Sequence, residues 1–313
     1  MRYFFMSVPF IVFSALHSIL FLTCQRWHKK RYVPYAGGTS RSLWLCFLLL
    51  GLSACSPTKN EPTNKYIKFV PSFADQSLAC NTSISIDDKL WSINELAFFI
   101  SQLRITDEHT SYPLTLVDNA WQSQNVALIR QSPDCAENRT NLQVSFSVED
   151  SSDLFLASNE SLKLRFSLGV PFEINHQNPV TQSSPLNDSS MFWAWRNGYK
   201  FIRWDMQNEM SEAWSFHLGS VGCESAAMVR APDQECKFPN RIEVSLPLKL
   251  NSLQNNEVVI NMDLSLVLGD LMPSQSTTCM FSSIDDPSCQ KLLNNSGNNK
   301  VFSVVPREMT EGE

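Results

Sequence analysis

Short runs of alternating apolar and polar residues fill the chain after residue 65 and constrain its fold more than any other feature. Such alternation places apolar side chains on one face of a β-strand, and clusters of Asn, Asp, Ser, Gly and Pro between the runs are typical of turns. Helical periodicity is weak, with Ile93–Gln102 and Met191–Asn197 as the short candidates. We predict an all-β fold, an antiparallel β-sandwich or barrel-like domain of about ten strands with few short helices. The runs are Tyr66–Val70, Phe98–Ile105, Tyr112–Val117, Val126–Arg130, Leu142–Val148, Leu162–Val170, Tyr199–Trp204, Trp214–Leu218, Arg241–Leu248 and Val258–Leu268.

The N-terminal region has the features of an export signal. Leu43–Leu52 is an apolar run with basic residues upstream, and the following Leu-Ser-Ala-Cys55 resembles a bacterial lipobox. That resemblance implies cleavage before Cys55 and attachment of lipid to it. Because Ser56 stands where an inner-membrane retention signal has Asp, we expect an outer-membrane lipoprotein that faces the periplasm or the cell surface. A second apolar stretch, Tyr3–Leu22, is either a transmembrane helix of roughly 20 residues or, as we expect, the product of an over-extended start.

Composition divides the whole chain into four parts. Residues 1–54 form the targeting region, and the polar residues 55–64 are expected to be a lipid-anchored linker. Residues 65–270 carry the β-patterned runs and form the predicted domain, while residues 271–313 are rich in Ser and Asn and are expected to be a mostly irregular tail.

The charge of the exported part argues against a nucleic-acid partner. The first 55 residues hold six basic and no acidic side chains, so the remainder has 19 basic and 31 acidic residues and a formal net charge of −12. Binding to phosphates needs a basic face, and the sequence has none.

Six cysteines remain when the two in the leader and the lipid-anchor cysteine are set aside. An even number in an oxidising compartment indicates disulfides. Six cysteines allow 15 connectivities, of which the sequential one is the simplest. It pairs Cys80 with Cys135, Cys223 with Cys236, and Cys279 with Cys289. No Cys-x-x-Cys motif occurs, which disfavours thiolate zinc sites and thioredoxin-like chemistry.

Aromatic residues and histidines gather between residues 175 and 223. Six aromatic side chains fall within Phe192–Trp204, and His176 and His217 flank them. The motifs of nucleophilic hydrolases, zinc proteases, P-loop enzymes and Rossmann enzymes are missing. Ser215 or Ser220 near His217 is only a weak hint of a hydrolytic pair, so we expect that the protein is not an enzyme.

Imidazoles beside indoles favour a metal site, although an intact indole is a poor ligand. The indole nitrogen is a hydrogen-bond donor without a free lone pair. Oxidative opening of the ring to kynurenine creates an aniline nitrogen that can bind a metal. A site of this kind therefore needs a second, oxidising protein.

Several motifs resemble the MbnP-like proteins, the four-cysteine proteins of metallo-mystery-pair systems. The resemblance covers roughly residues 66–270. It rests on Phe166–His176, Ser184–Asn187, Met191–Arg203, Phe216–Cys223 and Pro239–Arg241, supported by Trp121, Val126–Ile129 and Asn141. This chain departs from the pattern at Phe98–Ser101 and at Val221, which stands where a Thr is usual before Gly-Cys, and neither place contains a proposed ligand. The resemblance assigns the four family cysteines to Cys80, Cys135, Cys223 and Cys236, with Cys279 and Cys289 as additions.

The resemblance implies copper as the cofactor and a di-haem MbnH/MauG-like peroxidase as the partner, which oxidises a tryptophan of its companion to kynurenine. It makes His176 and His217 the expected ligands and Trp193 or Trp195 the expected oxidised residue. Trp204 and Trp214 are reserve candidates, Met191 is expected to pack, and His109 is expected on the surface.

Two alternatives follow from the same residues. In the first, the chain is a structural or adhesion-type β-sandwich of the cell surface without metal, whose tryptophans belong to the core. In the second, bound copper serves an oxidation reaction, although the sequence contains no sign of a substrate pocket.

Overall fold

The computed structural model describes residues 65–74, 76–147, 161–249, 252, 256–281 and 285–306. The predicted targeting region, Cys55 and the linker lie outside the described residues. Among those described, no helix is long and apolar enough to cross a membrane.

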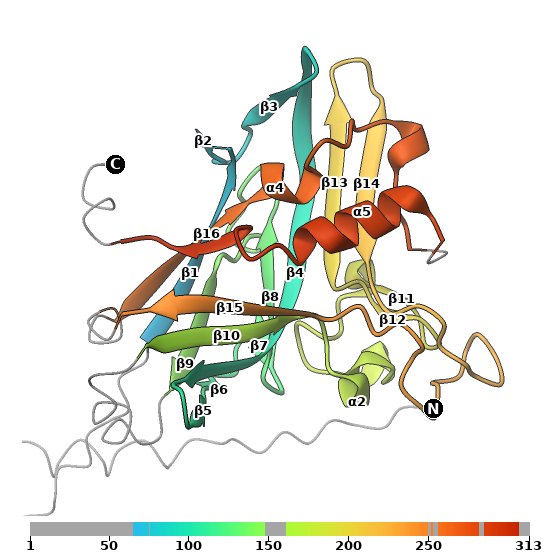
Figure 1. Cartoon of the computed structure of the whole chain (residues 1–313). Helices are drawn as coiled ribbons and strands as arrows, with labels where there is room; N and C mark the ends of the chain where they lie inside the picture. Colours follow the sequence, from blue (N-terminus) through green and yellow to red (C-terminus); the bar gives the residue numbers. More distant parts are fainter. Residues whose placement is uncertain are drawn as a thin grey trace, which may run out of the picture. The chain divides into compact units, whose positions relative to one another are not determined.

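Two large sheets form the body of the protein (Figure 1). The first has six strands in the order β17-β16-β1-β9-β6, with β2 beside β1. Its pairs are antiparallel except for β1 with β16, which run parallel. Its strands are β1 (Lys65–Phe73), β2 (Gln76–Ser77), β6 (Thr115–Leu116), β9 (Gln143–Ser147), β16 (Glu257–Asp263) and β17 (Phe302–Val304).

The second sheet has nine strands and is built around one long strand, β4. Its main order is β14-β13-β4-β10-β15, and β3, β5 and β8 also pair with β4, while β7 pairs with β8. Its strands are β3 (Ser83–Ile86), β4 (Lys89–Thr106), β5 (Ser111–Pro113), β7 (Gln122–Ser123), β8 (Val126–Gln131), β10 (Leu162–Leu168), β13 (Ile202–Asn208), β14 (Ala213–Leu218) and β15 (Ile242–Leu248).

Four phenylalanines fix the core between the two sheets. Phe69 of the first sheet meets Phe98 and Phe166 of the second edge to face, with ring centroids 5.5 and 5.9 Å apart. Phe302 of the first sheet meets the same two rings at 6.3 and 5.6 Å. Such pairs add about 0.5–1.5 kcal/mol each beyond the burial of apolar area. The prediction of an all-β, sandwich-like fold is confirmed.

The prediction of a helix at Ile93–Gln102 is wrong, because these residues lie in β4. Leu96–Ser101 is buried at every position, since this part of the strand is covered on both faces. A continuous apolar run of this kind does not reveal its period, so a buried strand resembles a buried helix. Met191–Asn197 is also not a helix, and it holds β11 (Phe192–Ala194), which pairs with β12 (Gly198–Tyr199) in a small separate sheet.

The C-terminal segment is more regular than expected and belongs to the same compact unit as the sheets. It adds β17 to the first sheet, and its helix α5 lies across β13 and β14 (Figure 1). The helix begins after Asp286, whose carboxylate accepts a hydrogen bond from the Cys289 amide at 3.0 Å, and Pro287 takes the first position. The helices are α2 (Phe172–Asn175), α4 (Leu264–Leu268) and α5 (Pro287–Ser296), and the 3-10 turns are η1 (Pro179–Thr181), η2 (Ser189–Met191) and η3 (Gln275–Thr277).

Candidate metal centre

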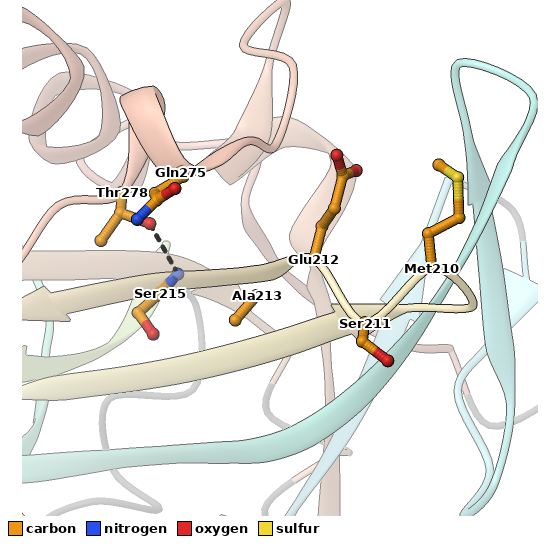
Figure 2. A pocket seen from close by; sticks show the side chains of 7 residues that line it. All are labelled: Met210, Ser211, Glu212, Ala213, Ser215, Gln275 and Thr278. Carbon is orange, nitrogen blue, oxygen red and sulfur yellow. Dashed lines mark hydrogen bonds between the residues drawn. The ribbon is translucent and has the colours of Figure 1, made fainter.

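A groove of about 570 Å³ lies at the tip of the β13–β14 hairpin, between Met210 and residues Gln275 and Thr278 (Figure 2). No histidine or cysteine lines it. Its carboxylate, Glu212, is already paired with Lys89 at 2.9 Å. The groove therefore contains neither predicted ligand, and the candidate site lies at the other end of the hairpin.

The short helix α2 positions the first predicted ligand. The buried amide side chain of Asn175 accepts a hydrogen bond from the Tyr199 backbone N–H at 2.8 Å and donates to Ser220 Oγ at 3.5 Å. Gly198 has a φ of +76°, and a Cβ there would lie 2.5 Å from atoms of the Asn175 amide, so this close approach requires glycine. These contacts hold His176, the next residue, against the β11–β12 loop and the chain that follows β14.

His176 has a defined tautomer. Its Nδ1 lies 2.9 Å from the carbonyl oxygen of Trp195, and a carbonyl only accepts, so Nδ1–H is the donor. Its Nε2 accepts from the Asn175 amide at 3.1 Å. Burial lowers the pKa of His176, although the hydrogen bond to Trp195 partly opposes this. The ring is therefore kept neutral, with a lone pair on Nε2, which is the form that binds a metal.

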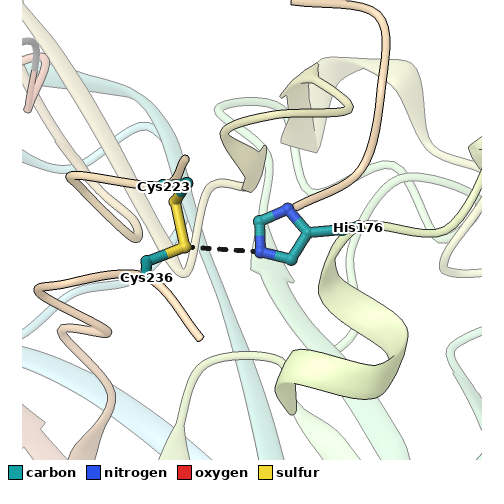
Figure 3. Close-up of side chains that lie close together, drawn as sticks. All are labelled: His176, Cys223 and Cys236. Carbon is teal, nitrogen blue, oxygen red and sulfur yellow. Dashed lines mark hydrogen bonds between the residues drawn. A yellow bond between two sulfur atoms is a disulfide. The ribbon is translucent and has the colours of Figure 1, made fainter. Parts of the chain in front are cut away.

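Two sulfur atoms lie next to this lone pair. The Sγ of Cys236 is 3.5 Å from His176 Nε2, and the possible donor atoms of His176, Cys223 and Cys236 all lie within 4.8 Å of one another (Figure 3). This group can hold a metal ion by its spacing. The two sulfurs form a disulfide, however, and disulfide sulfurs are weak metal ligands. While the disulfide is intact, the imidazole of His176 is therefore the strong metal ligand of this group.

The structure pairs all six cysteines of the domain sequentially. The bonds join Cys80 to Cys135, Cys223 to Cys236 and Cys279 to Cys289. Only the second of them is part of the histidine group.

His217 lies on β14 and belongs to a different network. Its Nε2 is 2.7 Å from Asp205 Oδ1, and an ionised carboxylate only accepts, so Nε2–H donates. Its Nδ1 is buried and has no hydrogen-bond partner among the described residues. Metal-binding histidines commonly donate one ring N–H to a carboxylate, which leaves the other nitrogen free for the metal. His217 has this arrangement with Nδ1 as the free atom.

Asp205 is a member of the site that the sequence analysis missed. It faces His217 only because β13 and β14 pair with Asp205 opposite Ser215 and Arg203 opposite His217. Burial alone raises its pKa, but hydrogen bonds from His217 and Ser215 and the charges of His217 and Arg203 hold the pKa of this carboxyl well below its usual range. Arg203 Nε also donates to its second oxygen at 2.7 Å. Asp205 is therefore a fixed anion behind the imidazole.

The structure separates the four candidate tryptophans by their surroundings. Trp204 and Trp214 are fully buried and pack edge to face with centroids 5.1 Å apart, which makes them core residues. Trp195 is 38% exposed, and its carbonyl holds His176. The ring of Trp193 is partly buried and packs directly over Gly219, where a Cβ would collide with it.

Trp193 packs on the segment of chain that connects the two histidine networks. Gly219 follows His217 by two residues, a separation of about 7 Å in an extended chain. Ser220, the next residue, contacts the amide of Asn175 beside His176. No hydrogen bond between described residues joins the two imidazoles directly, and the histidine–cysteine group contains His176 but not His217. The chain from His217 to Ser220 connects the two networks.

Two other residues lie as the sequence analysis expected. Met191 is fully buried in the core, and His109 is on the surface.

Comparison with known proteins gives one consistent result. The family model described as MbnP matches residues 62–281. The solved structure of MbnP from Methylosinus trichosporium is similar with a TM-score of 0.62 and 19% sequence identity, over 78% of this chain and 98% of that one. This likeness supports the shared fold. Comparison with curated protein sequences finds no match.

Proposed function

Because the chain belongs to the MbnP family, we propose that it is an extracytoplasmic copper-binding lipoprotein and not an enzyme. In this proposal His217 and His176 supply imidazole ligands. A di-haem partner of the MbnH/MauG type first oxidises a nearby tryptophan to kynurenine, whose aniline nitrogen completes the site. The lipid on Cys55 would anchor the protein to the outer membrane.

The free Nδ1 of His217 is the observation that carries this proposal. A buried imidazole nitrogen without a partner costs free energy, on the order of 1–3 kcal/mol. An ion at Nδ1 removes this cost, and the carboxylate of Asp205 stabilises the positive charge that the ring gains when it binds a cation. Imidazole suits copper, and copper(II) is also the most tightly bound divalent ion of the first transition row.

Trp193 is the better candidate for oxidation. Its ring packs against Gly219, two residues from His217, whereas the Trp195 side chain is turned partly to solvent and only its backbone carbonyl contacts His176. The aniline ring formed from Trp193 would therefore lie beside the strand that carries His217. Trp204 and Trp214 lie in the core and pack on each other, away from solvent.

Co-expression with the di-haem partner tests the proposal. Peptide mass spectrometry should find kynurenine at residue 193, and metal analysis should find copper. His217→Ala should abolish tight copper binding, while His109→Ala, which changes an exposed histidine, should not.

Two results would reject the proposal. Tight copper binding by His217→Ala contradicts the ligand assignment. Intact indoles and no copper after successful co-expression would favour a structural β-sandwich without metal. Kynurenine at residue 195 in place of 193 would reject only the choice of tryptophan.

A further inference from the structure

Among the described residues, Cys223–Cys236 is the disulfide that lies next to a histidine lone pair. Cys236 Sγ lies 3.5 Å from His176 Nε2, and all three donor atoms lie within 4.8 Å of one another. As a disulfide the sulfurs are weak donors, but as thiolates they are strong ligands for soft metals. We propose that reduction of this disulfide creates a second metal site, in which the two thiolates and His176 Nε2 bind Cu(I).

Backbone hydrogen bonds keep the two cysteines together without the disulfide. At the base of the loop that joins them, Val221 N donates to Phe238 O at 2.9 Å and Phe238 N donates to Val221 O at 3.0 Å. Lys237 N adds a bond to Gly222 O at 3.2 Å. The ends of the loop are therefore held together after reduction, and the thiols stay close to each other.

The imidazole is fixed independently of the sulfurs. Its Nδ1–H bond to the Trp195 carbonyl, at 2.9 Å, sets the ring orientation and keeps the lone pair on Nε2. The helix α2 and the Asn175 contacts set the backbone on which it sits. All three ligands are thus positioned before the ion arrives, which limits the ordering needed. Binding at Nε2 replaces one hydrogen bond, the one that this nitrogen accepts from the Asn175 amide at 3.1 Å.

The number and type of donors favour Cu(I). Soft thiolate ligands select Cu(I) and zinc, and structural zinc sites almost always have four protein ligands. This group offers three. The acidic charge of the exported part is compatible with a cation, although the group itself contains no carboxylate.

The redox step is an exchange with a dithiol. A thiolate of the reductant attacks Cys223, whose side chain is partly exposed, and the Cys236 sulfur, which is buried, leaves. The second thiol of the reductant then releases Cys223. One protein S–S bond is broken and one S–S bond forms in the reductant, so two electrons and two protons pass to the protein. Binding of Cu(I) to both thiolates releases these protons to solvent.

The test uses the full chain, expressed without the di-haem partner, reduced with dithiothreitol and freed of it anaerobically. Cu(I) is then titrated against bathocuproine disulfonate. We expect the reduced protein to bind additional Cu(I) with a thiolate-to-metal ultraviolet band that the oxidised protein lacks. His176→Ala should weaken this binding by more than the roughly 10- to 100-fold that loss of an outer-shell partner costs. His109→Ala, which changes an exposed histidine, should leave it unchanged.

Paired cysteine variants identify the sulfurs. Cys223→Ser with Cys236→Ser should lose the additional Cu(I) and its band, whereas Cys80→Ser with Cys135→Ser, which removes a disulfide outside the histidine group, should keep both. If the first variant does not fold, reduced wild-type protein alkylated at Cys223 and Cys236 replaces it.

Three results would overturn the inference. They are additional Cu(I) that survives loss of Cys223 and Cys236, no gain of Cu(I) on reduction, and loss of the fold, seen by circular dichroism, when this disulfide is reduced. The inference shares His176 with the proposed function but needs no kynurenine. If only the reductant-dependent Cu(I) site is not found, this inference is rejected. If only the His217-dependent copper site is not found, the proposed function is rejected.

Discussion

Replacement of Asp205 by Asn tests the pairing behind His217 most directly. The carboxylate accepts from His217 Nε2 and from Arg203 Nε, both at 2.7 Å. The side chains of His217 and Asp205 are only 7% and 17% exposed, so solvent screens the pair weakly. Asn has the same shape but only one accepting oxygen, and its NH₂ group must then face a donor. We expect a loss of about 1.5–3 kcal/mol of unfolding free energy, the range for a hydrogen bond to a charged group.

The same change should weaken copper binding. An outer-shell partner of a metal-binding histidine is worth roughly 10- to 100-fold in affinity. Without the carboxylate, Nε2 no longer has a fixed acceptor, so the ring can lose the tautomer and the orientation that present Nδ1. The affinity should fall within this range, while the kynurenine content should not change, because Asp205 is not the oxidised residue.

The pH dependence of stability gives an independent test of this pairing. The pKa of Asp205 is lowered in the folded state from its ordinary 3.8. The unfolded chain therefore takes up the proton at a higher pH than the folded one. The stabilisation is complete above about pH 4 and is lost as the pH falls through the lowered folded value. The difference in stability between wild type and Asp205→Asn should consequently be constant at neutral pH and shrink in strong acid.

Urea unfolding at several pH values and competitive copper titration measure these effects. Asp233→Asn, at an exposed position of the Cys223–Cys236 loop, makes the same change of charge and is the control. The reasoning is refuted if Asp205→Asn behaves like the control in stability and affinity, or if its stability deficit does not decrease in acid.

Three further predictions concern the surroundings of the site. Gly219→Ala should displace Trp193 and reduce kynurenine formation in co-expressed protein, as seen by peptide mass spectrometry, because the new Cβ would also lie 2.9 Å from the Tyr199 carbonyl. Gly297→Ala, whose Cβ meets nothing closer than 3.5 Å, should leave the yield unchanged. Since burial lowers the pKa of His176 from 6.5, the unfolded chain binds the proton first, so this residue should reduce stability as the pH falls through 6.5. His176→Gln should flatten that part of the urea-stability profile. Burial raises the pKa of Tyr199 to about 12, and Tyr199→Phe should cost about 1–3 kcal/mol in urea unfolding, because it leaves a buried carbonyl, that of Leu186, without a donor. An unchanged unfolding midpoint would contradict this last prediction.

The all-β class was predictable because the edge strands show their period directly. In β15 the apolar Ile242, Val244, Leu246 and Leu248 are buried and the residues between them are exposed. The interior of β4 was not predictable in the same way, because Leu96–Ser101 is buried on both faces. The helix α5 was missed although its signals are present in the sequence, with Asp286 and Pro287 at its start and Gly297 at its end.

The site was predictable in its histidines but not in what supports them. Motifs point to His176 and His217 because they are local in sequence. The pairing of His217 with Asp205 depends on the register of β13 and β14, which the loop between these strands fixes. A shift of one residue would turn Asp205 to the opposite face of the sheet. Likewise, the approach of Trp193 to Gly219 joins segments that lie far apart in the chain, and no periodicity predicts it.

The outer edge of β14 links the C-terminal segment to the candidate site. His217 N donates to Cys279 O and Cys279 N donates to Ser215 O, both at 2.8 Å, so the chain around Cys279 runs beside the strand that carries His217. Trp214 Nε1 donates to Thr277 O at 3.1 Å, which fastens the same segment to the core. A disulfide ties Cys279 to Cys289 in α5, beyond the end of the family match at residue 281. Without this segment β14 would be an open edge with unpaired backbone groups next to His217. The disulfide to α5 therefore stabilises the segment that covers the edge of the strand on which the buried imidazole is held.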